Sequence, residues 1–317
     1  TSMTSPLDPN AGGTALRILI TGASGLIGSS LIPHLEKQGH QVLRAVRRPP
    51  LTPDEVRWRP LTDAKELPTE ELEAFDNLDV VVHLAGENIA TGRWSEKKKS
   101  RIRSSRIEAT RNLVSLLSST SSPPGTFISS SAIGGYSADG DDGKTEASPL
   151  TDSFLGHLCR DWEESSAPLQ TVGTRVVHLR IGLVLTPAGG VLGKLLPIFR
   201  WGLGSRLGSG RQWMSWIDLD DLIRIISLSI KDSSIDGALN CVAPGAVRNI
   251  DFTTTLAAAL KRPVAPPIPE FIIRMLFGQM GQSLLLEGQR VTPARLNSRG
   301  FQFLSPDLPA ALRNQLR

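Results

Sequence analysis

The stretch RILITGASGLIG, residues 17–28, decides the fold class of this 317-residue chain. Residues 17–21 are a short aliphatic run typical of a buried strand, and the amphipathic segment after the turn ends near Gly39. Between them, Gly22, Gly25 and Gly28 are spaced GxxGxxG rather than GxGxxG. A glycine turn between strand and helix brings the backbone close to a pyrophosphate at the helix N-terminus. The order therefore predicts the first unit of a dinucleotide-binding domain.

Further strand-like runs recur along the chain, at residues 41–46, 79–84, 126–130, 175–184 and 237–242. They alternate with helical patterns at 102–118 and 153–165, which predicts an α/β Rossmann fold with a doubly wound parallel sheet. After residue 249 the pattern changes to helices interrupted by prolines, typical of a small, mostly helical C-terminal lobe. We therefore predict a disordered leader over residues 1–15, a nucleotide-binding domain with substrate-lobe insertions over 16–248, and a helical domain over 249–317.

Composition excludes several classes of function. The chain is 40% hydrophobic and 21% charged, and no apolar run has the length of about 18–20 residues that a membrane span needs. Its net charge of +4 reflects basic clusters at residues 44–48 and 97–106; we interpret the second as a solvated helix face, with nucleic-acid contact as the alternative. Cys159 and Cys241 are too few and too isolated for a disulfide framework or a zinc site, so no metal is expected.

The end of the second predicted strand indicates which dinucleotide is bound. An acidic residue there accepts a hydrogen bond from the ribose 2′-hydroxyl of NAD, whereas arginine pairs with the 2′-phosphate of NADP. The chain has Arg47 and Arg48 at this place, and no Asp or Glu between Gln41 and Pro53. This favours NADP(H), the alternative being that Arg48 merely extends into solvent.

Four segments carry a resemblance to a known family: residues 21–28 (TGASGLIG), 83–86 (HLAG), 128–132 (ISSSA) and 179–185 (LRIGLVL). Their order and spacing resemble those of extended short-chain dehydrogenases/reductases. Residues 84–89, 105–110, 154–163 and 284–291 narrow the resemblance to the atypical NAD-dependent-epimerase-like, SulA-type group of epimerase family proteins, which has its own C-terminal domain.

The resemblance implies a set of cofactor-binding residues. Leu84, Ala85 and Gly86, after the strand at 79–84, would line the adenosine and the nicotinamide ribose. Arg106 would reach a cofactor phosphate, with a plain surface ion pair as the alternative, and Val184 would flank the nicotinamide. The glycine turn would contribute Gly22, Ser24, Gly25, Leu26, Ile27 and Gly28.

The catalytic pattern of that superfamily is incomplete in this chain. Its members use a tyrosine followed four residues later by a lysine, which lowers the tyrosine pKa for proton exchange. Here the resemblance puts Leu155 and Cys159 at those positions, and neither performs that chemistry. Ser131 matches the partner serine and is expected to hold a substrate oxygen, unless it only satisfies backbone groups at the strand end.

Three residues are alternatives for the missing acid. Tyr136 is the only tyrosine and shares a loop with Ser131, Glu87 follows the 84–86 segment directly, and His157 lies on a predicted helix. Each also has a purely structural interpretation. Tyr136 would pack in the core, Glu87 would cap the segment that follows it, and His157 would be a surface or core residue whose hydrogen bonds are made within the protein. We expect Ser131 and Tyr136 to be catalytic and Glu87 to contact substrate.

The glycine-rich segment 202–216 precedes residues 217–221 (IDLDD), which resemble a stretch that borders the substrate in extended family members. The glycines permit a lid, and Trp213 is expected to contact substrate. Trp216 is expected to fill the interface between the lobes instead.

Two hypotheses of function remain open. The first is an NADP(H)-dependent oxidoreductase or epimerase for a small hydroxyl- or carbonyl-bearing substrate. The second is an NADP-binding regulator or scaffold that has lost the chemistry. We expect no nucleic-acid or membrane partner, a monomer or a homodimer, and a cytoplasmic location, or the plastid stroma if the organism is a eukaryote, since residues 1–14 lack a secretory signal.

Overall fold

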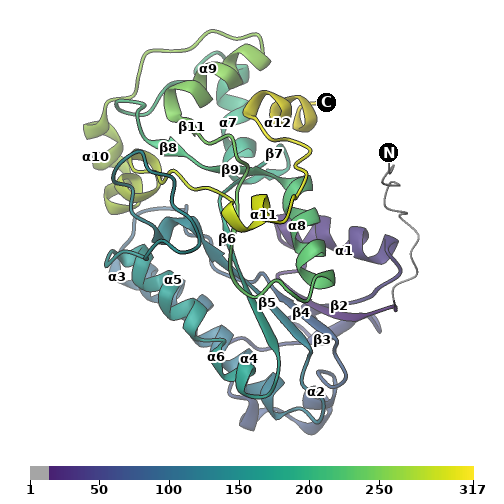
Figure 1. Ribbon diagram of the computed structural model, residues 1–317. Coiled ribbons are helices and arrows are strands. Elements are labelled where there is room, and N and C mark those ends of the chain that lie inside the picture. Colours follow the sequence, from purple (N-terminus) through teal and green to yellow (C-terminus); the bar gives the residue numbers. More distant parts are fainter. Residues whose placement is uncertain (1–13) are drawn as a thin grey trace, which may run out of the picture.

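The computed structural model of the chain describes residues 14–317. In this part, a sheet of seven parallel strands runs in the order β10-β6-β5-β4-β1-β2-β3 (Figure 1). The chain adds strands first on one side of β1 and then on the other, which confirms the doubly wound Rossmann fold. The strands are β1 (Arg17–Thr21), β2 (Gln41–Val46), β3 (Glu55–Arg57), β4 (Val80–His83), β5 (Thr126–Ala132), β6 (Arg175–Ile181) and β10 (Gly237–Cys241).

Helices cover both faces of this sheet, because successive strand residues point to opposite sides. Ile18 and Ile20 of β1 belong to an apolar core shared with α1 and α8, whereas Leu19 belongs to a second core shared with α4 and α6. These packed layers fix the strand ends at which the site lies. The covering helices are α1 (Leu26–Lys37), α2 (Thr69–Glu73), α4 (Ala109–Ser119), α5 (Phe154–Glu164), α6 (Ala167–Thr171) and α8 (Leu219–Lys231).

The predicted strand at 175–184 is two strands that bend apart at Gly182. A methyl group at Gly182 would lie 2.7 Å from the carbonyl oxygen of Ser215, so only glycine fits there. After the bend, β7 (Leu183–Thr186) leaves the main sheet and pairs with β9 (Trp216–Asp218). The bend carries the chain from the sheet into the C-terminal lobe. Short β3 is a strand that the sequence analysis did not predict.

The basic segment is less solvated than predicted. The expected helix at 102–118 consists of α3 (Glu96–Arg103), a π-helical turn (Ser104–Glu108) and α4. Lys98 of α3 is only 8% exposed, and its ammonium group pairs with Glu87 at 2.8 Å. The prediction of a wholly solvated face is therefore wrong for Lys98, because a carboxylate on the preceding loop draws it inward.

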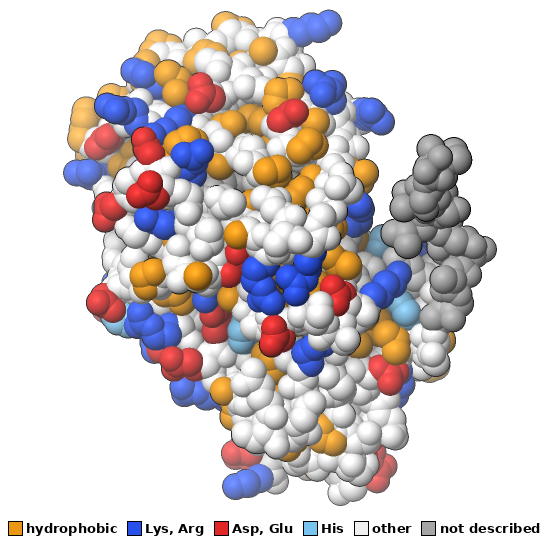
Figure 2. Space-filling model, viewed as in Figure 1, with side chains coloured by type: hydrophobic (Ala, Val, Ile, Leu, Met, Phe, Trp, Pro, Cys, Tyr) orange, Lys and Arg blue, Asp and Glu red, His pale blue; other side chains and the backbone are white. Residues whose placement is uncertain are grey.

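The C-terminal lobe lies beyond the carboxyl ends of the strands, in the upper part of Figure 1. The surface in the upper part of Figure 2 carries hydrophobic side chains beside basic ones. In residues 14–317, no helix has the length and apolar character to cross a bilayer. The division at residue 249 stays a prediction, and most of the predicted leader, residues 1–13, lies outside the described part. The lobe contains α7 (Gly190–Arg200), α9 (Asn249–Ala259), α10 (Glu270–Gly281), α11 (Ala294–Ser298), α12 (Leu308–Gln315), β8 (Trp213–Met214) and β11 (Val247–Arg248).

Two buried carboxylates at the start of α8 fasten the end of the chain. Asp221 accepts hydrogen bonds from the backbone N–H groups of Leu304 and Ser305, both at 2.9 Å. Asp218 accepts from the Ser305 hydroxyl at 2.8 Å and from Asn314 at 3.0 Å. Both carboxylates are fully buried. The segment that resembles a substrate border therefore anchors the last helix in this structure.

We expect Asp221→Ala to lower the free energy of unfolding by roughly 2–4 kcal/mol, because it leaves two backbone N–H groups without an acceptor. Urea denaturation followed by tryptophan fluorescence measures the change. Asp220→Ala is the matched control: Asp220 is exposed and accepts one bond, from Asn314, so its loss is expected to stay within about 1 kcal/mol. Equal losses in both variants would contradict this role of Asp221.

Candidate dinucleotide and substrate site

The glycine turn between β1 and α1 is closely packed by backbone. Gly22 has a φ of +69°, and a methyl group there would lie 2.9 Å from the backbone nitrogen of Ala85. At Gly28, a methyl group would lie 2.4 Å from the carbonyl oxygen of Gly22. Helix α1 begins after Gly25 without a side-chain cap, which leaves its first N–H groups for an anionic ligand. The turn therefore fits a dinucleotide pyrophosphate.

A buried hydrogen-bond chain positions the 84–86 segment beside this turn. The Thr21 hydroxyl accepts from the backbone nitrogens of Leu84 at 3.1 Å and Ala85 at 3.3 Å. It also bonds to Nδ1 of His83 at 2.7 Å, and Nε2 of His83 bonds to the Thr110 hydroxyl at 3.0 Å. Sequence analysis gave His83 no role, although a histidine inside the apolar run at 79–84 was the available signal.

Arg106, which the resemblance assigns to a cofactor phosphate, lies against the 84–86 segment. A methyl group at Gly86 would lie 3.4 Å from the guanidinium carbon of Arg106, which stands 5.1 Å from the Trp162 ring centroid. Among residues 14–317, Arg106 has no carboxylate within ion-pair distance, and burial lowers its pKa. Glu87, in contrast, pairs with Lys98 and Arg101, and the hydrogen bond from Lys98 lowers its pKa. Arg106 is thus a half-buried cation beside Gly86.

The two arginines after β2 differ in their surroundings. Arg48 forms a bidentate pair with Glu55, at 2.6 and 2.8 Å. Arg47 is exposed and has no ion-pair partner among the described residues. Arg47 is therefore the one with its donors available for a phosphate, while Glu55 competes for Arg48.

Ser131 and Tyr136 belong to one buried polar network. The Ser131 hydroxyl donates to Glu163 at 2.7 Å, and Glu163 is bound by Arg180 through two hydrogen bonds of 2.8 Å. Arg180 also donates to the Tyr136 hydroxyl at 2.7 Å, which in turn donates to Asn240 at 2.8 Å. The network joins α5, β6 and β10 to the loop after β5.

Charge pairing sets the protonation states in this network. Burial opposes ionisation of Glu163, but the hydrogen bonds and charge of Arg180 outweigh it and lower the Glu163 pKa. Burial raises the pKa of Tyr136, whose side chain is 1% exposed. Sequence analysis missed Glu163 and Arg180; the signal for Arg180 was a charged residue in the middle of the apolar run at 175–184.

Helix α5 places the two residues expected at the tyrosine and lysine positions. Leu155 lines a cavity, and the Cys159 thiol lies 3.5 Å from the Ala132 carbonyl oxygen, beside Ser131. Burial raises the pKa of Cys159 to about 11, so it stays a neutral thiol near pH 7. His157 is half exposed beside Asp152, away from Ser131.

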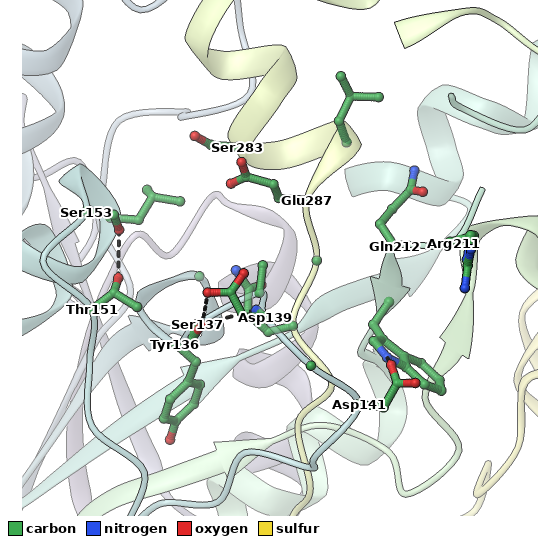
Figure 3. A pocket seen from close by; sticks show the side chains of 18 of the residues that line it. Tyr136, Ser137, Asp139, Asp141, Thr151, Ser153, Arg211, Gln212, Ser283 and Glu287 are labelled. Atoms are coloured by element: carbon green, nitrogen blue, oxygen red, sulfur yellow. Dashed lines mark hydrogen bonds between the residues drawn. The ribbon is translucent and has the colours of Figure 1, made fainter. Parts of the chain in front are cut away.

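Two adjoining cavities lie between the sheet and the C-terminal lobe. The inner chamber, about 260 Å³, is mainly apolar and extends from Ala132 and Leu183 to α7 and residues 283–289. The outer cleft, about 700 Å³, is more polar, and Figure 3 shows Ser283 and Glu287 across it from Thr151 and Ser153. In Figure 3 the Tyr136 hydroxyl points away from these side chains, into the buried network.

Trp213 stands between the chamber and the cleft and lines both. The guanidinium groups of Arg248 and Arg290 lie over its ring, 3.9 and 4.8 Å from the centroid, and its indole nitrogen donates to Asp141 at 3.0 Å. These contacts hold the ring in place as a wall. Trp216 is fully buried in the main core, and Val184, on β7, follows the chamber residue Leu183.

His83 makes the fold sensitive to acid. Its burial lowers its pKa from 6.5 to about 4, so the unfolded chain takes up this proton at a higher pH than the folded chain. The contribution of His83 to the free energy of unfolding is therefore complete above pH 6.5 and is lost as the pH falls towards 4. Between pH 6.5 and 4, we expect the free energy of unfolding of wild type to fall by about 3 kcal/mol more than that of His83→Gln. Urea denaturation at each pH measures both values.

The matched control for this experiment is His157→Gln, on the exposed side of α5. It should keep the wild-type dependence of unfolding free energy on pH. A His83→Gln curve parallel to that of wild type between pH 6.5 and 4 would refute the assignment.

Comparison with known proteins places the chain in a family. Residues 18–241 match the NAD dependent epimerase/dehydratase family, and residues 268–315 match a domain of unknown function, DUF1731. The chain is 40% identical to the epimerase family protein ML0860 of Mycobacterium leprae, over 90% of this chain and 91% of that protein. It is 35% identical to the chloroplastic SDR39U1 homolog of Arabidopsis thaliana, over 94% of this chain and 86% of that protein.

A solved structure agrees in fold over nearly the whole chain. The crystal structure of human epimerase family protein SDR39U1, solved with NADPH, superposes with a TM-score of 0.85 at 34% identity, covering 95% of this chain and 99% of that one. The match extends through the C-terminal lobe, as the resemblance implied. The chain therefore belongs to the NAD dependent epimerase/dehydratase family of short-chain dehydrogenase/reductase-like proteins, in the group whose members carry this additional C-terminal domain.

Proposed function

We propose that this chain is an NADP(H)-dependent oxidoreductase or epimerase for a small hydroxyl- or carbonyl-bearing substrate. The observation that carries the proposal is Arg47, exposed and unpaired within the described residues at the end of β2, with no carboxylate in residues 42–52 to select NAD. The NADPH in the crystal structure of the human relative supports the same choice.

The residues present fit such a cofactor. The turn from Gly22 to Gly28 would hold the pyrophosphate, Arg47 the 2′-phosphate, and the 84–86 segment the adenosine and nicotinamide ribose. Arg106 would neutralise a phosphate, and Val184 would flank the nicotinamide. The bound cofactor supplies hydride transfer at the nicotinamide ring.

Within the protein, Ser131 would hold the substrate oxygen. Its hydroxyl proton is donated to Glu163, so its oxygen would accept a hydrogen bond from a substrate hydroxyl or from an ordered water, and its neighbour Ala132 lines the inner chamber. The proton would come from an ordered water or from Tyr136. The bonds of Tyr136 to Arg180 and Asn240 favour the water, because the hydroxyl is turned away from the cavities and committed to the network. Tyr136 then acts as a positioning residue.

The second function remains an NADP-binding regulator or scaffold. Leu155 and Cys159, at the positions of the usual tyrosine and lysine, favour it, since a leucine and a neutral thiol supply no acid. Such a protein would bind the nucleotide without consuming it. We propose a cytoplasmic location or a plastid stroma, the second supported by the chloroplastic name of the Arabidopsis relative, and a monomer or homodimer.

We expect Arg47→Ala to raise the Kd for NADPH about 10- to 100-fold and to leave the Kd for NADH unchanged, because a charge-assisted bond to the 2′-phosphate is worth roughly 1.5–3 kcal/mol. Calorimetric titration with each nucleotide measures both constants. Arg48→Ala is the matched variant, with a smaller expected effect because Arg48 is engaged by Glu55. Wild type that binds neither nucleotide would refute the proposal.

Turnover separates the two functions and tests the proton donor. With NADPH and a panel of carbonyl compounds, we expect consumption in wild type, a loss of about 10- to 100-fold in kcat for Ser131→Ala, and most of the activity retained in Tyr136→Phe. NADPH absorbance at saturating cofactor provides the measurement. Activity abolished in Tyr136→Phe, with NADPH binding intact, would instead make Tyr136 the acid, and binding without any consumption would favour the regulator.

A further inference from the structure

We propose that the substrate of this site has an uncharged hydrocarbon body, an aliphatic or aromatic aldehyde, ketone or alcohol, that fills the inner chamber. A nucleotide sugar does not fit this description. The inference rests on the proposed oxidoreductase function and deepens it by naming the class of substrate.

Most of the surface that lines the inner chamber is apolar. Helix α7 supplies one wall, the bend between β6 and β7 a second, and the segment that follows α10 a third. Such surface gains about 25 cal/mol for each Å² that a ligand removes from water, and it offers few partners to hydroxyl groups. The apolar lining residues include Val191, Leu195, Phe199, Leu183, Leu284 and Leu285.

Three of the polar residues that line the chamber are bonded to its walls; its other polar lining residues are Ser205, Thr253, Ser283, Glu287 and Gln289. Gln212 donates to the carbonyl oxygens of Leu207 at 3.1 Å and Leu285 at 2.9 Å. Ser215 donates to the Gln289 carbonyl at 2.7 Å and accepts from a backbone nitrogen at 2.9 Å. Asn249 accepts from the Leu207 nitrogen at 2.8 Å. These three residues hold the walls together, so a ligand hydroxyl would compete with wall contacts to bond to them.

The chamber is lined by the chain neighbours of the residues where chemistry is proposed, and not by Ser131 or Val184 themselves. Ala132 adjoins Ser131, and Leu183 adjoins Val184, which is expected to flank the nicotinamide. Leu155, at the position of the usual tyrosine, adds an aliphatic wall at this end. A reacting carbonyl at this end would therefore project its hydrocarbon part towards α7.

The outer cleft does not favour a diphosphate. Its lining carries Asp139, Asp141 and Glu287 against Arg211 and Arg248, and Arg248 already pairs with Asp141. A diphosphate would meet more carboxylates than available guanidinium groups. The carboxylates would repel its negative charge. Figure 3 shows Asp139 and Glu287 on opposite sides of the opening. Charge in the cleft thus agrees with an uncharged ligand.

The first arm of the experiment measures specificity with the full chain and NADPH. A series of straight-chain aldehydes from propanal to decanal should show kcat/KM rising roughly fourfold for each added methylene, until the chamber is filled, because each buried CH₂ is worth about 0.8 kcal/mol. UDP-glucose should neither react nor compete. A series without any dependence on chain length, or competition by UDP-glucose, would overturn the inference.

The second arm measures the chamber without turnover, using the neutral fluorescent probe N-phenyl-1-naphthylamine and its displacement by decanol. Leu195→Gln should weaken probe binding at least tenfold, and Leu195→Met should restore it. Ile198→Gln is the matched control, because Ile198 lies on the outer side of the same helix and is 46% exposed. Its probe affinity should equal that of wild type.

The two arms separate failure of this inference from failure of the proposed function. Probe binding that is absent, or equally weakened by Leu195→Gln and Ile198→Gln, overturns the apolar chamber. Probe binding that decanol displaces, and that is lost in Leu195→Gln but not in Ile198→Gln, supports the apolar chamber. This holds whether or not the protein consumes NADPH. Loss of NADPH binding in calorimetry, in contrast, refutes the proposed function and leaves the probe result standing.

Discussion

The buried ion pair between Glu163 of α5 and Arg180 of β6 is the interaction on which the candidate site depends, because it links this helix and this strand to Ser131. Burying these charges is costly, and the cost is offset here by two short hydrogen bonds and by Ser131 and Tyr136, which complete the shells of the two groups. Because the pair joins Glu163 of α5 to Arg180 of β6, it ties this helix to the sheet. Removing either partner would leave an unpaired charge in the core.

This network lies beside Leu155 and Cys159 of α5, the residues that the resemblance puts at the positions of the tyrosine and the lysine. With Leu155 and Cys159 on α5, the strongest charges near Ser131 are those of Glu163 and Arg180, and they neutralise each other. The electrostatic character of the site is therefore different from that of a tyrosine held near a lysine. A mainly apolar chamber beside a polar network whose groups bond to one another agrees with the proposed hydride transfer to a weakly polar molecule.

Much of the fold was predictable from local pattern. The 17–28 segment sufficed for β1, the turn and α1, since only glycine tolerates the contact of Gly22 with Ala85. Alternation of apolar runs with helical patterns predicted the sheet. The bend at Gly182 was not predictable, because it depends on the approach of Ser215 from a distant segment, and the apolar period continues across it.

The site was predictable where backbone geometry defines it, and less so where side chains pair across the fold. Arg47 and Arg48 have the same type and neighbouring positions, yet Glu55 engages only one of them. Lys98 belongs to a basic run that reads as solvated, but the tertiary placement of Glu87 draws it inward. Such pairings depend on how far apart the packed helices, strands and loops lie, which cannot be inferred from one stretch of sequence.

The clasp of Asp218 and Asp221 on the last helix affects the order of events during synthesis. Leu308 and Leu312 of α12 belong to the same apolar core as β1 and α1, although nearly 300 residues separate them from the first strand. While residues 304–315 are still in the ribosome, that core has an open side, and Asp218 and Asp221 lack the donors that these residues supply. The nascent Rossmann domain therefore exposes part of its apolar core until α12 has emerged. During this interval a chaperone would have the most apolar surface to bind.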